Sequence, residues 1–147
     1  MLTKSTEYAI RALVYVQLQN WDKKRPGVNE IAKEIETPPA FTAKILQLLT
    51  KHKLIESSKG RGGGFYFGNE NQDLTLYKVI VIMEGDSCFT KCGFGLKNCS
   101  NNNPCPLHEK YVHVREGFLE IAETETIQTI SKRIVDGKAF LKSENLL

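Results

Sequence analysis

Hydrophobic residues recur at helical spacing three times in the first third of the chain. The spacing predicts helices over residues 5–19, with Ser5 or Thr6 as the cap, over a short segment capped by Asn29, and over residues 39–52. The positions predicted to face the core are Ala9, Leu13, Val16, Ile31, Ala32, Ile35, Phe41, Ile45, Leu48 and Leu49.

An extended segment with a glycine-rich turn follows these helices. Residues 54–56 and 65–67 are predicted to form two strands of a hairpin. Glycine reaches positive φ angles without steric cost, as a tight hairpin tip requires. The turn contains Gly60, Gly62, Gly63 and Gly64. Three short helices and a glycine-tipped hairpin are the element order of a winged helix-turn-helix, so the predicted fold class is mainly α with a small β-hairpin wing.

The second half of the chain predicts two further helices around a long loop. The first covers residues 74–83, with Asp73 as its cap, and the loop covers residues 85–106. After the loop, apolar residues alternate at spacings of four and three, the period of a coiled-coil seam. They are Leu107, Tyr111, Val114, Phe118 and Ile121. We therefore predict a long C-terminal dimerisation helix; packing of this helix on its own domain is the alternative.

Length and composition fit one integrated domain. The chain has 147 residues, of which 41% are hydrophobic, which is enough to bury a core without disulfides. Residues 1–68 are predicted to form the winged helix-turn-helix DNA-binding unit, and residues 69–147 the cysteine loop and dimerisation helices. The longest apolar run, residues 79–83, is far shorter than the roughly 20 residues of a membrane helix. No signal peptide is evident, so we expect a cytoplasmic protein with no membrane partner.

Charge is distributed unevenly along the chain. Residues 1–68 carry a net charge of +5 and residues 69–147 a net charge of −2. A basic surface suits a polyanion, and the second helix of a helix-turn-helix enters the major groove of double-stranded DNA. The predicted DNA-binding residues are Thr42, Lys44, Gln47 and Lys51 on the third helix and Lys59 and Arg61 at the wing tip. For Arg61, a solvated wing tip is the alternative.

All four cysteines lie in the long loop, in the arrangement Cys88-x3-Cys92-x6-Cys99-x5-Cys105-x2-His108. Thiolates are soft ligands that suit iron–sulfur clusters, zinc or copper(I). Structural zinc sites usually contain Cys-x2-Cys pairs, which this chain lacks, so an iron–sulfur cluster is favoured over zinc. A metal-free thiol sensor remains an alternative. Cys88 lies outside the main pattern, and His108 is either a fourth ligand or a surface residue.

Several segments together resemble one known family. They are LTKSTEYAIRAL, NEIAKEI, ILQLLTKHKLIESSKGRGGGF and the loop with Cys92, Cys99 and Cys105. They resemble the IscR and NsrR type of bacterial winged-helix regulators, which also includes the cluster-free CymR type. The resemblance implies a homodimer that binds a palindromic operator and responds to iron–sulfur status, nitric oxide or redox stress. It implies cluster ligation by Cys92, Cys99 and Cys105, with His108 or Glu7 of the partner subunit as the fourth ligand.

Two features depart from that family. The gap between Cys92 and Cys99 is six residues, where five is usual. Pro38, Ala43 and Lys44 stand where the IscR type has base-reading serine, glutamate and glutamine. The family's operator sequence therefore does not transfer to this chain.

These observations predict a dimeric transcriptional regulator, expected to be a repressor, whose DNA affinity is controlled by a two-iron or four-iron cluster. The chain has no glycine-rich phosphate loop that opens a helix, and nothing in it predicts an enzyme. One alternative is a cluster-free regulator that responds to thiol oxidation or to a metabolite. The other, from a different class, is a small iron–sulfur carrier or electron-transfer protein.

Overall fold

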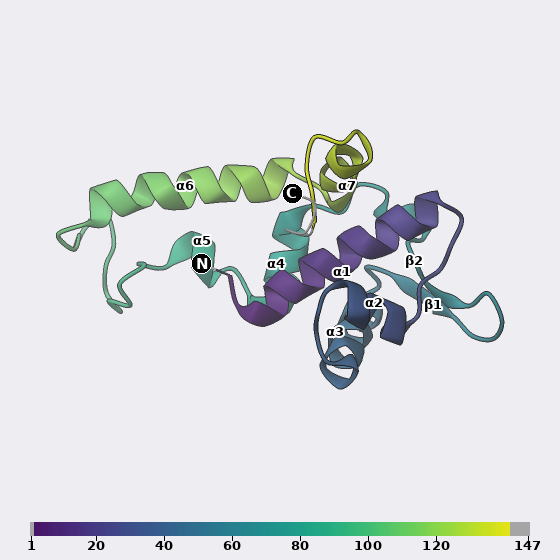
Figure 1. Cartoon of the computed structure of the whole chain (residues 1–147). Coiled ribbons are helices and arrows are strands. Elements are labelled where there is room, and N and C mark those ends of the chain that lie inside the picture. Colours follow the sequence, from purple (N-terminus) through teal and green to yellow (C-terminus); the bar gives the residue numbers. More distant parts are fainter. Residues whose placement is uncertain (1, 142–147) are drawn as a thin grey trace.

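The computed structural model describes residues 2–141; the last six residues of the predicted second unit, 142–147, lie outside this range. The fold is mainly helical, with one two-stranded antiparallel sheet, as predicted (Figure 1). Its elements are α1 (Lys4–Trp21), α2 (Val28–Glu34), α3 (Pro39–Lys51), β1 (Glu56–Ser58), β2 (Gly64–Tyr66), the 3₁₀ turn η1 (Asn69–Asn71), α4 (Leu76–Glu84), α5 (Ser87–Thr90), α6 (His108–Thr124) and α7 (Ile127–Val135).

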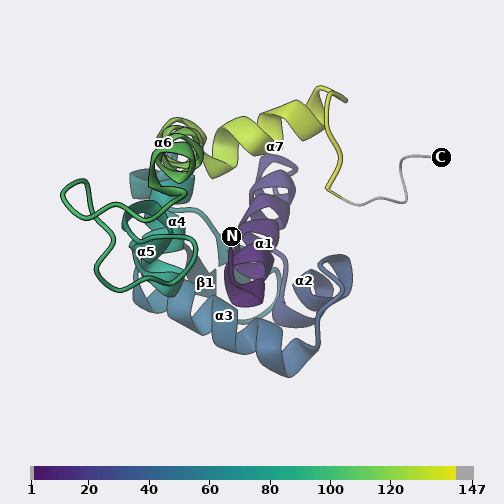
Figure 2. The same cartoon turned by 90° about the vertical axis from the view of Figure 1, so that its left-hand side faces the viewer.

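Helix α1 is the centre of the core. The predicted stripe of Ala9, Leu13 and Val16 is completely buried. Figure 2 shows α1 between α7 on one side and α3 on the other, with α2 and α4 beside it. Because neighbours cover α1 on several sides, Ala12 and Val14 are also buried, although they lie outside the predicted stripe.

Three predicted helix caps were wrong. The side chain of Thr3, not Ser5 or Thr6, accepts the hydrogen bond from the Thr6 N–H at the start of α1. Helix α2 follows Gly27 and has no side-chain cap, so Asn29 lies inside it. Thr75, not Asp73, caps α4, because the backbone at residue 74 pairs with the start of α7. The two residues whose side chains do cap these helices, Thr3 and Thr75, lie where contacts with distant parts of the chain fix the direction in which the backbone enters the helix.

The buried face of α3 differs from the predicted one. Thr42, Ile45, Leu46 and Leu49 form it, whereas Leu48 is only partly buried. Thr42 tolerates burial because its hydroxyl donates to the Pro38 carbonyl at 3.1 Å. The prediction that the Thr42 side chain faces DNA is therefore contradicted: it lies in the core of this chain.

The wing is a short hairpin in which Glu56, Ser57 and Ser58 pair with Tyr66, Phe65 and Gly64. The first strand begins two residues later than predicted, since Leu54 and Ile55 turn into the core and are buried. Gly60 and Gly62 at the tip have φ angles of +88° and +70°, as expected for a tight turn.

The predicted seam on α6 divides into two sets of residues. Tyr111 and Phe118 turn toward their own chain, where the Phe118 ring lies 5.2 Å from that of Phe89 on α5. Leu107, Val114 and Ile121, seven residues apart, remain exposed at 44%, 52% and 53%. Packing on its own domain thus accounts for two of the five seam positions, and the other three remain as an exposed stripe with heptad spacing.

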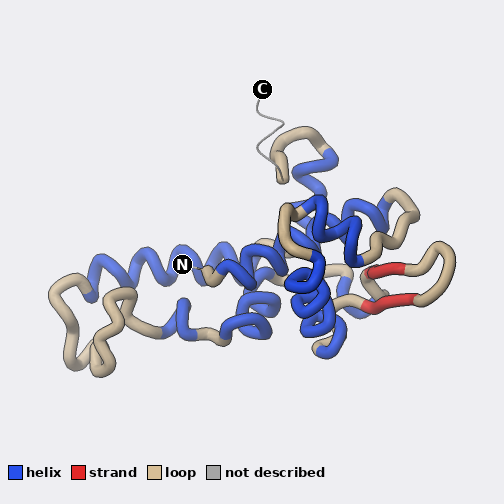
Figure 3. The backbone as a smooth tube through the Cα atoms, turned by 60° about the horizontal axis from the view of Figure 1, so that its bottom comes forward, coloured by secondary structure: helices blue, strands red, loops and turns tan. Residues whose placement is uncertain are grey.

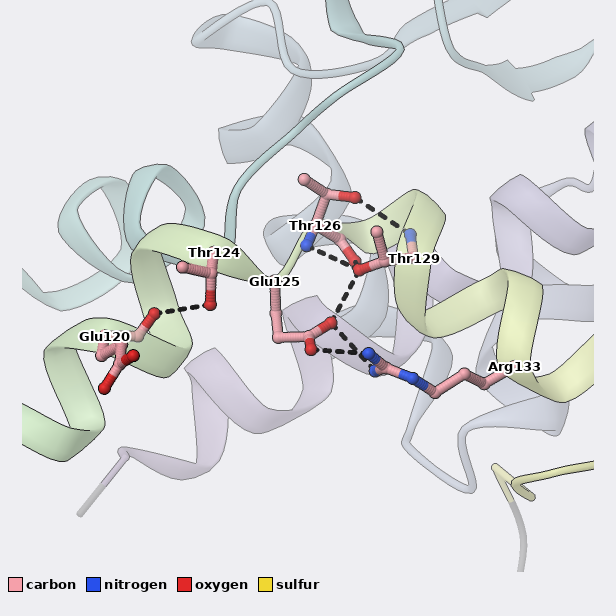
Figure 4. Close-up of polar contacts among 6 residues, drawn as sticks. All are labelled: Glu120, Thr124, Glu125, Thr126, Thr129 and Arg133. Carbon is pink, nitrogen blue, oxygen red and sulfur yellow. Dashed lines mark hydrogen bonds and ion pairs between the residues drawn. The ribbon is translucent and has the colours of Figure 1, made fainter.

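Helix α7 was not predicted. Thr126 and Thr129 form a reciprocal capping box at its start, with threonine in place of the usual glutamate or glutamine at the third helical position. Figure 4 shows the corner between α6 and α7, where Glu125 contacts both Thr129 and Arg133. Helix α7 then packs along α1 and joins the second half of the chain to the first. Among residues 2–141, no helix has both the length and the apolar character to cross a bilayer.

Candidate nucleic-acid interface and metal centre

The exposed face of α3 carries three of the predicted DNA-binding residues. Lys44, Gln47 and Lys51 are exposed and lie at spacings of three and four, on one side of the helix. Lys59 and Arg61 are exposed on the turn between β1 and β2. The structure therefore presents five of the six predicted residues to solvent and withdraws Thr42.

The wing and the cysteine loop lie at opposite ends of the molecule. Figure 3 shows the two strands of the wing at one end and the long loop before α6 at the other. Helices α1, α4 and α6 span the distance between them (Figure 1). Any influence of the loop on DNA contacts must therefore pass through the helical body or through a second subunit.

Three cysteines converge in the loop. The Sγ atoms of Cys92, Cys99 and Cys105 all lie within 4.8 Å of one another, and those of Cys92 and Cys105 are 3.9 Å apart. The Cys105 N–H donates to the Cys99 sulfur at 3.3 Å. Three thiols at these distances provide soft sulfur donors on one side of a shared centre, which suits an iron–sulfur cluster or a thiophilic metal ion.

His108 adjoins the three thiols. Its Nδ1 atom lies 3.2 Å from Cys99 Sγ, and its Nε2 atom lies 2.9 Å from Asn101 Oδ1. Because an amide oxygen only accepts hydrogen bonds, Nε2 carries the proton in this contact. In the neutral ring, Nδ1 then presents its lone pair toward the thiols, which is the tautomer that a metal-binding histidine needs. Sequence spacing gave no signal for Asn101, since only the folding of the loop brings it to His108.

The backbone of the loop distinguishes the thiols electrostatically. Hydrogen bonding from the Phe94 N–H lowers the pKa of Cys92. The Leu107 N–H acts in the same direction on Cys105, but burial and the neighbouring thiols Cys99 and Cys92 outweigh it and raise the Cys105 pKa. Cys92 is therefore the thiol of this pair that deprotonates more readily.

Tyr111 anchors the loop on α6. A Cβ at Gly93 would lie 2.2 Å from the Tyr111 ring, so the residue after Cys92 has no room for a side chain. The Phe94 ring makes an edge contact with the same tyrosine, with ring centroids 5.9 Å apart. Arg115, one turn further along α6, donates to the carbonyls of Thr90 and Lys91, both at 3.2 Å. Tyr111 was predicted to lie in the coiled-coil seam and not against the loop. The sequence signal for its contact with the loop was the glycine at position 93, next to the candidate ligand Cys92.

The other candidate ligands are placed differently. Cys88 lies on α5, outside the group of three thiols, and burial and the nearby Glu84 carboxylate raise its pKa. Glu7 lies in the first turn of α1, where its carboxylate pairs with Lys4 at 3.2 Å. Within residues 2–141 of one chain, Glu7 does not join the thiol group.

Comparisons with known proteins agree on the kind of protein. A family model described as Rrf2, an iron-dependent transcriptional regulator, matches residues 2–133. The chain is 26% identical over 135 residues to the transcriptional regulator NsrR of Oceanobacillus iheyensis, and the match covers 89% of each protein.

Two solved structures share the fold. CymR of B. subtilis matches with a TM-score of 0.72 and 15% identity, covering 90% of this chain and 96% of that one. IscR of T. potens matches with a TM-score of 0.71 and 16% identity, covering 100% of this chain and 96% of that one. These structures support the winged-helix architecture.

Proposed function

The chain belongs to the Rrf2 family of transcriptional regulators, which are DNA-binding proteins and not enzymes, and we propose that an iron–sulfur cluster controls its affinity for operator DNA. The observation that carries this proposal is the convergence of Cys92, Cys99 and Cys105 within 4.8 Å. Such a cluster supplies a redox- and nitric-oxide-sensitive group, and the resemblance to the NsrR and IscR types supports a repressor that responds to these signals or to iron–sulfur status.

The proposed DNA interface consists of α3 and the wing. Lys44, Gln47 and Lys51 lie on the exposed side of α3, which a major groove accommodates, and Lys59 and Arg61 extend the basic surface at the wing tip. Each lysine or arginine that neutralises a phosphate adds about 0.9 to the slope of log affinity against log salt. Binding should therefore weaken steeply as salt increases.

The proposed assembly is a homodimer formed through α6. Leu107, Val114 and Ile121 recur at seven-residue spacing and remain exposed in the single chain. Burying such a stripe against a second copy removes apolar surface from water and pairs the two winged helices on a palindromic operator. A partner chain also gives Glu7 of the partner subunit a route to the thiols.

Cofactor content tests the cluster proposal. The protein would be purified without oxygen, and its visible spectrum, iron and acid-labile sulfide would be measured. We expect a coloured protein that loses its cluster on substitution of Cys92, Cys99 or Cys105 by serine but retains it in Cys88→Ser, the matched control. A colourless protein with stoichiometric zinc would contradict the proposal, and a metal-free protein whose DNA affinity follows thiol oxidation would favour the cluster-free regulator.

A footprint on the promoter DNA upstream of its own gene tests the regulator proposal. We expect salt-dependent protection of a palindromic site, with different affinities for the cluster-loaded and cluster-free proteins. A difference of about 1–3 kcal/mol between the two forms is enough for a useful switch. Equal affinity in both forms would remove cluster control.

A further inference from the structure

The loop between α1 and α2 is attached to the wing by one side chain. The Arg25 guanidinium carbon lies 3.8 Å from the centroid of the Tyr66 ring, within the range of a cation–π contact. The Arg25 NH1 group also donates to Ser58 Oγ at 3.1 Å. Ser58 belongs to β1 and Tyr66 to β2, so Arg25 contacts both strands of the hairpin.

The backbone beside Arg25 is attached to the same hairpin. The Phe65 N–H donates to the Pro26 carbonyl at 2.9 Å. A Cβ at Gly64 would lie 2.2 Å from the Arg25 carbonyl oxygen, so β2 approaches this loop closely only because residue 64 is glycine. Residues 25 and 26 therefore line the outer edge of β2 in place of a third strand.

Asn20 completes the attachment from the end of α1. Its Nδ2 group donates to the carbonyls of Lys24 and Phe65 at 2.9 and 3.2 Å. Its Oδ1 atom accepts from the Phe67 N–H at 2.9 Å. The loop and β2 are thus both connected to the last turn of α1, the helix whose preceding turns lie at the centre of the core.

The wing needs this support because it is small. Each strand has three residues, and an isolated two-stranded hairpin is marginally stable in water. Lys59 and Arg61 lie on the glycine-containing turn beyond those strands, with no core contact of their own. The direction in which they project is therefore set at the base of the hairpin.

We propose that Arg25 is a positioning residue of the DNA interface, since its contacts with Tyr66 and Ser58 fix the direction in which the wing presents Lys59 and Arg61 to DNA. This inference rests on the proposed DNA-binding function. The contacts of its guanidinium in this chain are with the hairpin, so the proposed role of Arg25 is exerted through the wing, and the variants below distinguish it from a phosphate contact.

The first experiment measures wing order without DNA. Amide hydrogen exchange would be compared among the wild type, Arg25→Met and Lys24→Met. Lys24 is the matched control because it lies in the same loop and pairs with Asp22 at 3.2 Å. We expect faster exchange at the Phe65 amide in Arg25→Met alone, with unchanged exchange in α1 and α3. Unchanged exchange in the wing of Arg25→Met would overturn the proposal, whether or not the protein binds DNA.

The second experiment measures the DNA contacts. A duplex would be selected from a randomised library with the wild-type protein, and hydroxyl-radical footprints and salt slopes would be recorded for each variant. We expect Arg25→Met to lose the protection under the wing, keep that under α3, and reduce the salt slope by about 1.8 per subunit, the equivalent of two phosphate contacts. Lys24→Met should reduce the slope by at most about 0.9 and keep the wing footprint.

Two further variants separate position from charge. Gly64→Ala keeps every charge but forces Arg25 and Pro26 away from β2, so it should also lose the wing footprint. Arg25→Lys keeps the charge but cannot stack on Tyr66 and reach Ser58 together, so it should recover only part of the wing footprint. If Arg25→Lys behaved as the wild type and Arg25→Met matched Lys24→Met, Arg25 would be an ordinary phosphate contact. A wild-type protein that selects no duplex would refute the proposed DNA-binding function. The exchange experiment would still decide whether Arg25 holds the wing in place.

Discussion

Glu125 and Arg133 form a two-point ion pair across the corner between α6 and α7. Arg133 donates through NH2 to Oε1 at 2.6 Å and through NH1 to Oε2 at 2.9 Å (Figure 4). The Thr129 hydroxyl donates to the same carboxylate at 2.7 Å, and the Glu125 carbonyl accepts from the Leu76 N–H at 3.0 Å. The corner therefore fixes α6, which follows the cysteine loop, to α7, which packs on α1.

Removing this ion pair should lower stability modestly. Arg133→Ala is expected to reduce the free energy of unfolding only slightly, because the pair is partly exposed but has favourable two-point geometry. Lys132→Ala is the matched control, since Lys132 makes a single 3.4 Å contact with Asp136 on the exposed side of the same helix. Urea denaturation would measure both variants. A loss for Lys132→Ala as large as that for Arg133→Ala would contradict the assignment.

Acid should weaken the attachment of α1 to α4. Burial raises the pKa of the Glu84 carboxyl, but hydrogen bonds from Thr6 and Thr3 outweigh burial and hold it below the ordinary value of 4.5. A carboxylate with a lowered folded-state pKa contributes stability above its ordinary pKa and loses it as the pH falls through the folded-state pKa. We therefore expect Glu84→Gln to be less stable than the wild type by about 1 kcal/mol at pH 7.

The two proteins should converge as the pH falls through the lowered folded-state pKa of Glu84, below its ordinary value of 4.5, because the wild-type carboxyl then also becomes neutral. Denaturation at several pH values would measure this difference. A stability gap that stayed constant from neutral to acid pH would show that the charge of Glu84 contributes nothing.

The identity of the fourth ligand should separate two variants. His108 Nδ1 already lies beside the Cys99 sulfur in one chain, whereas Glu7 does not join the thiol group of its own chain, so its proposed ligation requires the partner subunit. We expect His108→Ala to shift the visible spectrum of the loaded protein and Asn101→Ala to produce a smaller shift by releasing the ring. An unchanged spectrum in His108→Ala together with a shift in Glu7→Ala would assign the ligand to Glu7 of the partner subunit.

A charge in the exposed stripe of α6 should prevent dimerisation. Val114 lies at its middle and is 52% exposed in the single chain. Val114→Glu is expected to give a monomer in analytical ultracentrifugation, because burying unpaired carboxylates at the centre of an interface is costly. Glu116→Gln, also on α6 but outside the stripe, serves as the control. A dimeric Val114→Glu would place the interface elsewhere.

A side chain at position 93 should displace the cysteine loop. Gly93→Ala places a methyl group against the Tyr111 ring, so either the ring or the adjacent Cys92 must move. We expect lower iron and sulfide content per chain, with little change in helix content by circular dichroism. Gly93→Ala combined with Tyr111→Leu should recover part of the loading, since the smaller side chain leaves space. Full loading in Gly93→Ala alone would contradict this close approach.

Much of the fold was predictable because its signals are local. The burial of Ala9, Leu13 and Val16 follows from helical periodicity, which needs no knowledge of the partners of the helix. The glycine-rich turn likewise predicted the wing, since positive φ angles at Gly60 and Gly62 are a backbone property.

The candidate site was predictable in composition but not in arrangement. Clustered cysteines indicated which thiols to consider, and the structure brings Cys92, Cys99 and Cys105 together while leaving Cys88 apart. The contact of His108 with Asn101 depends on the path of the whole loop, and no residue spacing specifies that path.

By itself, the sequence determined the order of the three helices and the hairpin in the first half, the basic charge of that half and the chemistry of the cysteine loop, because these depend on residue type and short-range spacing. Only the tertiary structure decided that Thr42 faces the core, that Thr3 and Thr75 cap their helices, and that Tyr111 packs on its own loop. In each case neighbouring residues of similar propensity were available. Packing against segments distant in the sequence selected among them, since burial and hydrogen-bond satisfaction are properties of the assembled chain.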